Sequence, residues 1–230
     1  VFAVPRDRLP EMEAAVAACQ EQGVVAKIGL EPFPARHGRL TVEDLEGIAV
    51  LSYASAPQDA LPLLAKRAFD VVASALALVV LSPLLAAVAL AVRLDSPGPV
   101  LFRQRRVGLS GRTFTLYKFR SMRAGAEAEQ PRLADRNEMD GPVFKLRDDP
   151  RVTRAGRVLR RTSLDELPQL WNVLRGEMSL VGPRPPLPEE VRRYERWQRR
   201  RLSVKPGITC TWQVSGRSEV GFGRWMQLDL

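Results

Sequence analysis

Residues 71–92 read VVASALALVVLSPLLAAVALAV, an apolar run that carries Ser82 and Pro83 near its middle. A run of roughly twenty apolar residues lets a helix cross the hydrocarbon core of a bilayer. Pro83 lacks a backbone N–H and its ring clashes with the carbonyl four residues earlier, so the run predicts a helix that kinks near its centre. The Ser82 hydroxyl is expected to bond a backbone group that the kink frees.

Positive charge lies on both sides of this run. Lys66 and Arg67 precede it, and Arg93 and further arginines follow it. Because Lys and Arg mark the side of a membrane that is not translocated, neither flank is expected to cross. The pattern favours a re-entrant helix over residues 66–93, which dips into one leaflet and returns. The residues alone leave open a Pro-kinked helix that spans the bilayer, whereas the dense flanking charge disfavours the buried helix of a soluble protein.

The net positive charge of the chain lies in the part that contains the apolar run. Residues 1–65 hold five Lys and Arg against nine Asp and Glu, a net charge of −4, whereas residues 66–230 hold thirty against seventeen, a net charge of +13. Such a surface attracts anionic lipid and phosphate substrates. No recognised nucleic-acid motif is present, so nucleic acid is not expected as a partner. Cys19 and Cys210 form no disulfide framework or metal spacing, which suits a reducing compartment and places the chain at the cytoplasmic face.

The remaining segments predict a mixed α/β chain. A strand over residues 1–4, a helix over 10–22 and a strand over 24–28 form one β-α-β unit, without the glycine-rich loop of a phosphate site. Residues 52–65 are predicted to be a linker. Strands over 100–106 and 113–119 form a hairpin, followed by a charged helix and loop over 124–141. The chain has no initiating Met and is expected to be part of a longer protein.

The densest chemistry lies in residues 148–186, where arginines surround a pair of acids. Ser163 and Glu166 have the spacing of a capping box, which predicts a helix from Ser163 to about Asn172 with an ionised Asp165 in its first turn. An oriented carboxylate can attack phosphorus, and the adjacent Glu166 could hold Mg²⁺. Arginines could clamp a diphosphate through paired donors. The residues also allow a plainer role, in which both acids only interact with the helix dipole.

Six motifs carry a specific resemblance. KRAFD at 66–70, KFRSM at 118–122, DPRVTR at 149–154, SLDELPQ at 163–169, GEMSLVGPRP at 176–185 and KPGIT at 205–209 resemble the bacterial sugar transferase family, the monotopic phosphoglycosyl transferases. The resemblance implies a small mixed α/β catalytic domain over 94–230, truncated at its end, that is held on the membrane by a re-entrant helix-break-helix. Residues 1–51 resemble the end of the Rossmann-like, nucleotide-binding-like domain that precedes the transferase in larger members.

The same resemblance implies transfer of a hexose phosphate from a UDP-sugar to undecaprenyl phosphate, with release of UMP. UDP-galactose and UDP-glucose are favoured, and the reaction initiates exopolysaccharide, capsule or O-antigen synthesis on the cytoplasmic face of the inner membrane. Two alternatives are a membrane-attached scaffold without turnover and a glycosyl transferase that releases UDP. A homodimer through the N-terminal domain is a further expectation.

Residue roles follow from the matching motif positions. Asp165 is expected to be the nucleophile that carries a covalent phospho-sugar, and Glu166 to help hold Mg²⁺. The expected substrate contacts are Lys118, Arg160, Arg184, Arg217 and Asp229, and the expected membrane residues are Lys66, Arg67, Ser82 and Pro83. Residues 192–201 hold six arginines with Tyr194 and Trp197, which predicts a helix at the depth of the lipid headgroups, with a solvated charged helix as the alternative.

Overall fold

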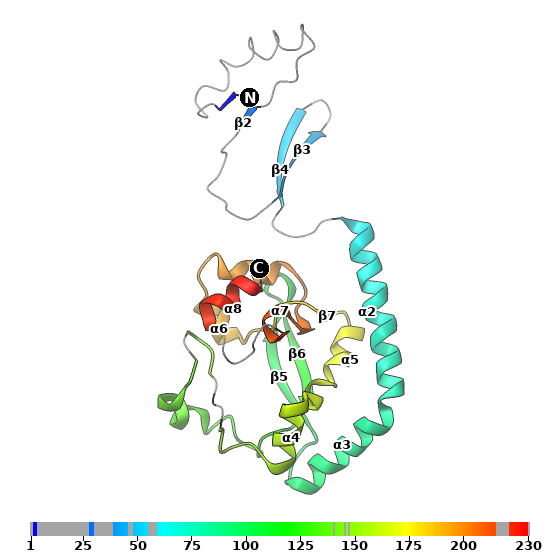
Figure 1. Cartoon of the computed structure of the whole chain (residues 1–230), viewed down its shortest axis with the longest axis vertical. Coiled ribbons are helices and arrows are strands. Elements are labelled where there is room, and N and C mark those ends of the chain that lie inside the picture. Colours follow the sequence, from blue (N-terminus) through cyan, green and yellow to red (C-terminus); the bar gives the residue numbers. More distant parts are fainter. Residues whose placement is uncertain are drawn as a thin grey trace. The chain divides into compact units, whose positions relative to one another are not determined.

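The structure is a computed structural model that describes residues 2–3, 28–29, 39–45, 48–54 and 59–229, apart from 140, 145, 147 and 215–220. The chain divides into two compact units, Val1–Ser55 and Ala56–Leu230. In the first unit, β1 (Phe2–Ala3) pairs in parallel with β2 (Ile28–Gly29). β3 (Arg39–Leu45) and β4 (Ile48–Ala54) form an antiparallel pair (Figure 1). The helix predicted over 10–22 lies outside the described residues, and the Rossmann-like assignment stays a prediction.

The predicted linker is too long at both ends. β4 continues to Ala54, and α2 (Ala60–Val80) begins six residues before the predicted start of the membrane helix. The sequence ALPLLAKRAF that opens α2 contains mainly strong helix formers, so the helix extends upstream of the charged pair Lys66 and Arg67. The connection between the described ends of β4 and α2 is therefore residues 55–59.

α2 and α3 (Ser82–Asp95) form a helix pair that is bent by 63°. Pro83 has no N–H to offer the Val79 carbonyl, which lies four residues before it, and the Ser82 hydroxyl donates to that carbonyl instead, at 2.8 Å. The predicted kink and the predicted role of Ser82 are thus confirmed. In the part of the chain that is described, no single helix is long and apolar enough to cross a membrane. The two helices of this bent pair, taken together, have the length and apolar composition of a membrane segment.

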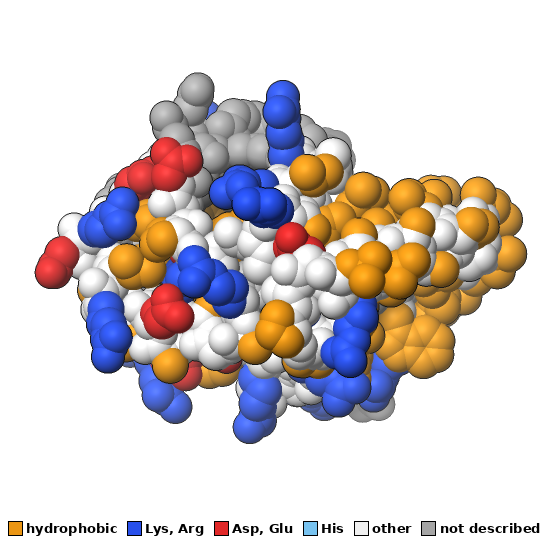
Figure 2. Space-filling model, turned by 90° about the horizontal axis from the view of Figure 1, so that it is seen from below, with side chains coloured by type: hydrophobic (Ala, Val, Ile, Leu, Met, Phe, Trp, Pro, Cys, Tyr) orange, Lys and Arg blue, Asp and Glu red, His pale blue; other side chains and the backbone are white. Residues whose placement is uncertain are grey.

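The first helix of the bent pair, α2, exposes apolar side chains and buries polar ones. The side chains of Phe69, Val72 and Val79 are 66–71% exposed, whereas Asp70 and Ser74 on the same helix are buried against the rest of the unit. Figure 2 shows hydrophobic side chains covering one projecting part of the molecule, with Lys and Arg over much of the remaining face. In α2 this arrangement is the reverse of a soluble amphipathic helix, in which the apolar stripe faces the core, whereas α3 buries Val88 and Val92.

A two-stranded hairpin forms the centre of the second unit. β5 (Leu101–Val107) pairs antiparallel with β6 (Thr113–Phe119), within one residue of the predicted strands. Two of its buried residues belong to different core clusters. Phe119 packs with Val88 and Val92 of α3 and with Leu159, while Leu116 packs with Val173 and Met178. The hairpin therefore packs against α3 and α4 through one cluster, and against α5 and the residue before β7 through the other.

Shorter elements complete the unit (Figure 1). Helical segments are η2 (Leu109–Gly111), η3 (Gln130–Arg136), α4 (Arg154–Thr162), η4 (Leu164–Glu166), α5 (Gln169–Leu174), α6 (Pro188–Arg192), η5 (Gln198–Ser203), α7 (Thr211–Val214) and α8 (Phe222–Leu228). β7 (Ser179–Val181) pairs in parallel with β8 (Gly207–Thr209). A third core cluster contains Val143, Tyr194, Cys210, Phe222, Trp225 and Met226.

Two predicted helices are wrong. The described residues of 124–141 form turns and the short 3₁₀ helix η3 rather than a charged α-helix. Residues 192–201 are not one helix, because the chain is interrupted between α6 and η5; Tyr194 and Arg201 are buried, whereas Trp197 is exposed, and the headgroup position of this segment stays a prediction. Arg201 is held inside because it donates to the Tyr194 hydroxyl at 3.0 Å and to a carboxylate of Asp229 at 2.6 Å. Internal partners of this kind offset the cost of removing a charge from water.

Candidate active site

The acid pair lies on a tight turn between two helices, not at the start of one. Ser163 has φ of 59°, ends α4, and makes no side-chain cap bond to the following turn, so the predicted capping box is wrong. A helix running on from Ser163 would also need a donor at Pro168, which has none, and α5 accordingly begins at Gln169. Asp165 and Glu166 therefore occupy the 3₁₀ turn η4.

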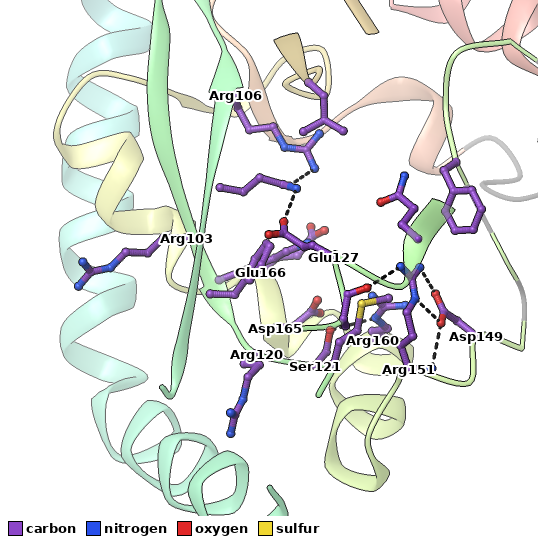
Figure 3. Close-up of a pocket in the computed structure, with 18 of the residues that line it drawn as sticks. Arg103, Arg106, Arg120, Ser121, Glu127, Asp149, Arg151, Arg160, Asp165 and Glu166 are labelled. Atoms are coloured by element: carbon purple, nitrogen blue, oxygen red, sulfur yellow. Dashed lines mark hydrogen bonds and ion pairs between the residues drawn. The ribbon is translucent and has the colours of Figure 1, made fainter. Parts of the chain in front are cut away.

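Five of the predicted site residues line one pocket of about 1550 Å³. They come from separate parts of the chain: Lys118 from β6, Arg160 from α4, Asp165 and Glu166 from η4, and Arg184 from the loop after β7. Figure 3 shows the acid pair between Arg106 on one side and Arg160 on the other. The pocket thus places two carboxylates among several cations.

Asp165 is buried between two of these cations. Burial raises the pKa of its carboxyl above the ordinary value, and the positive charges of Lys118 and Arg160 act in the opposite direction. The helix N-terminus that was expected to favour its ionised form is absent, because Asp165 lies on the 3₁₀ turn η4, and the charges that favour that form are those of Lys118 and Arg160. Arg160 is oriented by its Nε, which donates to the Ser121 hydroxyl at 3.0 Å.

Lys118 and Arg106 crowd positive charge into the same pocket. Burial, together with the nearby Arg106 and Arg184, lowers the pKa of Lys118 to about 8. Burial and Arg184 lower the pKa of Arg106 to about 10. The Lys118 ammonium also lies 5.6 Å from the centre of the Phe102 ring. Cations that repel each other in a desolvated site favour a bound anion, which would offset their mutual repulsion.

The sequence interpretation missed Arg106. Its guanidinium donates to the Pro185 carbonyl at 3.0 Å and to the Gln104 amide oxygen at 2.6 Å, and its Nε is buried without a hydrogen-bond partner. Strand alternation could have found it, because in this register Arg106 shares the Lys118 face of the hairpin. Figure 3 shows the neighbouring Arg103 pointing to the other side.

Two predicted substrate contacts are not among the described residues of the pocket. Arg217 lies outside the described residues. Asp229 faces the third core cluster, where it pairs with Arg201 at 2.6 Å and accepts from the Trp225 indole at 2.9 Å. Arg201 also donates to the Arg184 carbonyl at 2.8 Å, so Asp229 is linked to the pocket through the backbone that carries Arg184.

The residues present are compatible with Mg²⁺. Among the described residues, no three His, Cys, Asp or Glu side chains form a group that could hold a metal ion by themselves. Mg²⁺ is commonly bound by one or two carboxylates together with substrate phosphates, and Asp165 and Glu166 supply two carboxylates on the wall of the pocket.

Lys66 and Arg67, the predicted membrane residues at the start of the apolar run, contact the protein itself. Lys66 pairs with Asp70 at 3.2 Å and donates to the Ser179 hydroxyl. Arg67 donates to the carbonyls of Val173 and Leu174 at 2.6 and 2.9 Å. Both side chains therefore attach α2 to the segments that follow the acid pair.

Comparison with known proteins gives a consistent result. The family model described as bacterial sugar transferase matches residues 61–230. The galactosyl transferase CpsE of Streptococcus agalactiae is 41% identical over 213 residues, which are 92% of this chain and 47% of that protein. The undecaprenyl-phosphate galactose phosphotransferase of Salmonella typhimurium is 44% identical over 171 residues, 71% of this chain and 35% of that protein.

A third relative, the UDP-glucose:undecaprenyl-phosphate glucose-1-phosphate transferase of Escherichia coli, is 43% identical over 187 residues, 80% of this chain and 38% of that protein. The chain spans less than half the length of each of these three relatives.

Proposed function

The chain belongs to the bacterial sugar transferase family, and we propose that it transfers a hexose phosphate from a UDP-sugar to undecaprenyl phosphate, with release of UMP. The observation that carries this proposal is the position of Asp165, a buried carboxylate between Lys118 and Arg160 in a pocket rich in cations. The names of the relatives support the substrates, since they include undecaprenyl phosphate and UDP-glucose.

The reaction proceeds in two displacements at one phosphorus atom. A carboxylate oxygen of Asp165 attacks the phosphorus that bears the sugar, and the bond from that phosphorus to the bridging oxygen breaks, so that UMP leaves with the bond electrons. A phosphate oxygen of undecaprenyl phosphate then attacks the same phosphorus and displaces the Asp165 carboxylate. A carboxylate nucleophile with a covalent intermediate divides one difficult transfer into two easier ones.

The cations of the pocket bind and orient the charged groups. Lys118, Arg106 and Arg184 lie together and would hold the diphosphate, while Arg160 faces Asp165 from the other side. Arginine donors arranged around a phosphate also stabilise the charge that develops during its transfer. Mg²⁺, held by Glu166 and Asp165 with the substrate, would neutralise phosphate charge.

The bent helix pair provides the membrane attachment in this proposal. Its exposed apolar surface enters one leaflet of the inner membrane, and its bend at Ser82 and Pro83 returns the chain to the cytoplasmic face. Undecaprenyl phosphate has its anionic head at that surface and its hydrocarbon in the bilayer. A pocket held at headgroup depth therefore receives the lipid phosphate and the water-soluble UDP-sugar from the same side.

Nucleotide release from the full chain in anionic lipid vesicles tests the proposal. We expect UMP from UDP-galactose or UDP-glucose in the presence of undecaprenyl phosphate, and we expect Asp165→Asn to abolish it. Asp135→Asn, which changes an exposed acid on η3, is the matched control and should retain activity. UDP as the released nucleotide would indicate a glycosyl transferase, and release of neither nucleotide would favour a scaffold role. Radiolabel from the sugar should remain on the wild-type chain after denaturation.

A further inference from the structure

The two halves of the bent helix pair contact the two helices that flank Asp165. α4 ends just before η4, and α5 begins just after it. α3 packs against α4, and α2 packs against α5, as Figure 1 shows. The turn that carries Asp165 is therefore bracketed by two elements, each of which is attached to a different half of the bent pair.

The attachment of α2 to α5 is made by Arg67. Its two terminal nitrogens donate to the Val173 and Leu174 carbonyls, at 2.6 and 2.9 Å, in the last turn of α5. The last carbonyls of a helix have no partner inside it and carry partial negative charge, so a guanidinium there satisfies both needs. Asp70, one turn further along α2, accepts from the Leu180 N–H at 3.2 Å and thereby also fixes β7.

α3 is attached to α4 by the apolar cluster that contains Val88, Val92 and Leu159, and by a hydrogen bond that Asp95 accepts. Its carboxylate accepts from the backbone N–H of Ala155, at 3.1 Å, in the first turn of α4, where the N–H groups lack intrahelical partners. The end of α3 is held in turn by Arg120, the residue after β6, which donates to the Ser96 carbonyl at 2.7 Å. α4 then carries Arg160 to its position beside Asp165.

We propose that Arg67 and Asp95 are positioning residues of the active site, through which the bend of the α2–α3 pair sets the placement of Asp165 against Arg160. α2 and α3 are joined at Leu81 and bent by 63°, so α5 and α4 are attached to the two halves of one bent element. The membrane helix is then part of the catalytic scaffold as well as an anchor. This inference rests on the proposed transfer reaction for its activity readout.

Variants at the two attachments test the proposal in the full chain, reconstituted in vesicles. We expect Asp95→Ala and Arg67→Gln to lower kcat for UMP release about ten- to a hundredfold, since a displacement on the order of 1 Å can cost about a hundredfold. KM for the UDP-sugar should change little, because the cations of the pocket remain. Asp95→Asn keeps an acceptor oxygen and should restore most of the activity. Arg93→Gln is the control, because Arg93 lies on the same helix but donates to the Gly98 carbonyl and not to α4.

A second readout separates positioning from simple stabilisation. Bilayers of shorter or longer acyl chains should change wild-type kcat, because hydrophobic mismatch is relieved by tilting or bending the inserted helices. Asp95→Ala and Arg67→Gln should lose this dependence, as the bent pair no longer transmits its angle to α4 and α5.

Three results would overturn the inference: unchanged kcat in both variants, an activity loss that matches the loss of folded membrane-bound protein, or a thickness dependence equal to that of the wild type. Absence of UMP release from the wild type would instead refute the proposed function, so the two failures are distinguishable.

Discussion

Raising the pH from 7 to 9 should slow the first displacement by removing the charge of Lys118. Burial is the main cause that lowers the pKa of this ammonium from 10.5 to about 8, with Arg106 and Arg184 adding to the effect and Asp165 and Glu166 opposing it. Because the pKa is lowered, the cation is present below about pH 8 and is lost as the pH rises through that value.

The size of the effect follows from the titration. A group that titrates near pH 8 is roughly nine-tenths charged at pH 7 and roughly one-tenth charged at pH 9. If the charged form of Lys118 is needed to hold the diphosphate, kcat/KM for the UDP-sugar should fall about tenfold over this interval, since that parameter reports the ionisation of the free enzyme. In a two-displacement mechanism, kcat/KM for the UDP-sugar does not depend on the lipid substrate. Ionisation of undecaprenyl phosphate therefore does not contribute to its pH profile.

The assay is initial UMP release at limiting UDP-sugar, in the same vesicles from pH 7 to 9, with recovery of activity on return to pH 7. Lys118→Arg is the matched variant, because arginine stays charged throughout the range. The variant can be slower at every pH, but its fall above pH 8 should disappear. A flat wild-type profile, or the same fall in Lys118→Arg, would refute the assignment of this titration to Lys118.

Three further predictions concern Asp229, Glu166 and Pro83. Asp229→Ala leaves Arg201 buried without its carboxylate and should lower the free energy of unfolding by about 3–5 kcal/mol. Denaturant titration measures the loss, and a change below about 1 kcal/mol would contradict the pairing. Glu166→Gln should raise the Mg²⁺ concentration for half-maximal UMP release, and an unchanged requirement would count against a metal role. Pro83→Ala should straighten the helix pair; cysteines introduced just outside its two ends should then be labelled from opposite sides of the membrane, whereas labelling of both from the cytoplasmic side would disprove the prediction.

Two predictions from local sequence patterns were wrong, one because of a nearby proline and the other because of partners elsewhere in the chain. The spacing of Ser163 and Glu166 fits a capping box, but Pro168 cannot donate within a continuing helix, and the chain forms a 3₁₀ turn instead. The arginine-rich segment 192–201 has the composition of a surface helix, yet Arg201 finds internal partners in Tyr194 and Asp229. Composition does not reveal partners that lie far away in the chain.

Several features depend only on neighbours in the chain and are visible without a fold. The bend of the apolar run follows from the ring of Pro83 and the hydroxyl of Ser82, and the hairpin follows from its alternation and its Gly108–Gly111 turn. The motifs likewise predict Asp165 and Glu166 to be the reactive pair. The environment of Asp165 does not depend on its neighbours in the chain alone, because Lys118 and Arg160 are brought to it from two other elements. Desolvation and the approach of distant charges decide its protonation, and both arise only when the hairpin, α4 and η4 pack together.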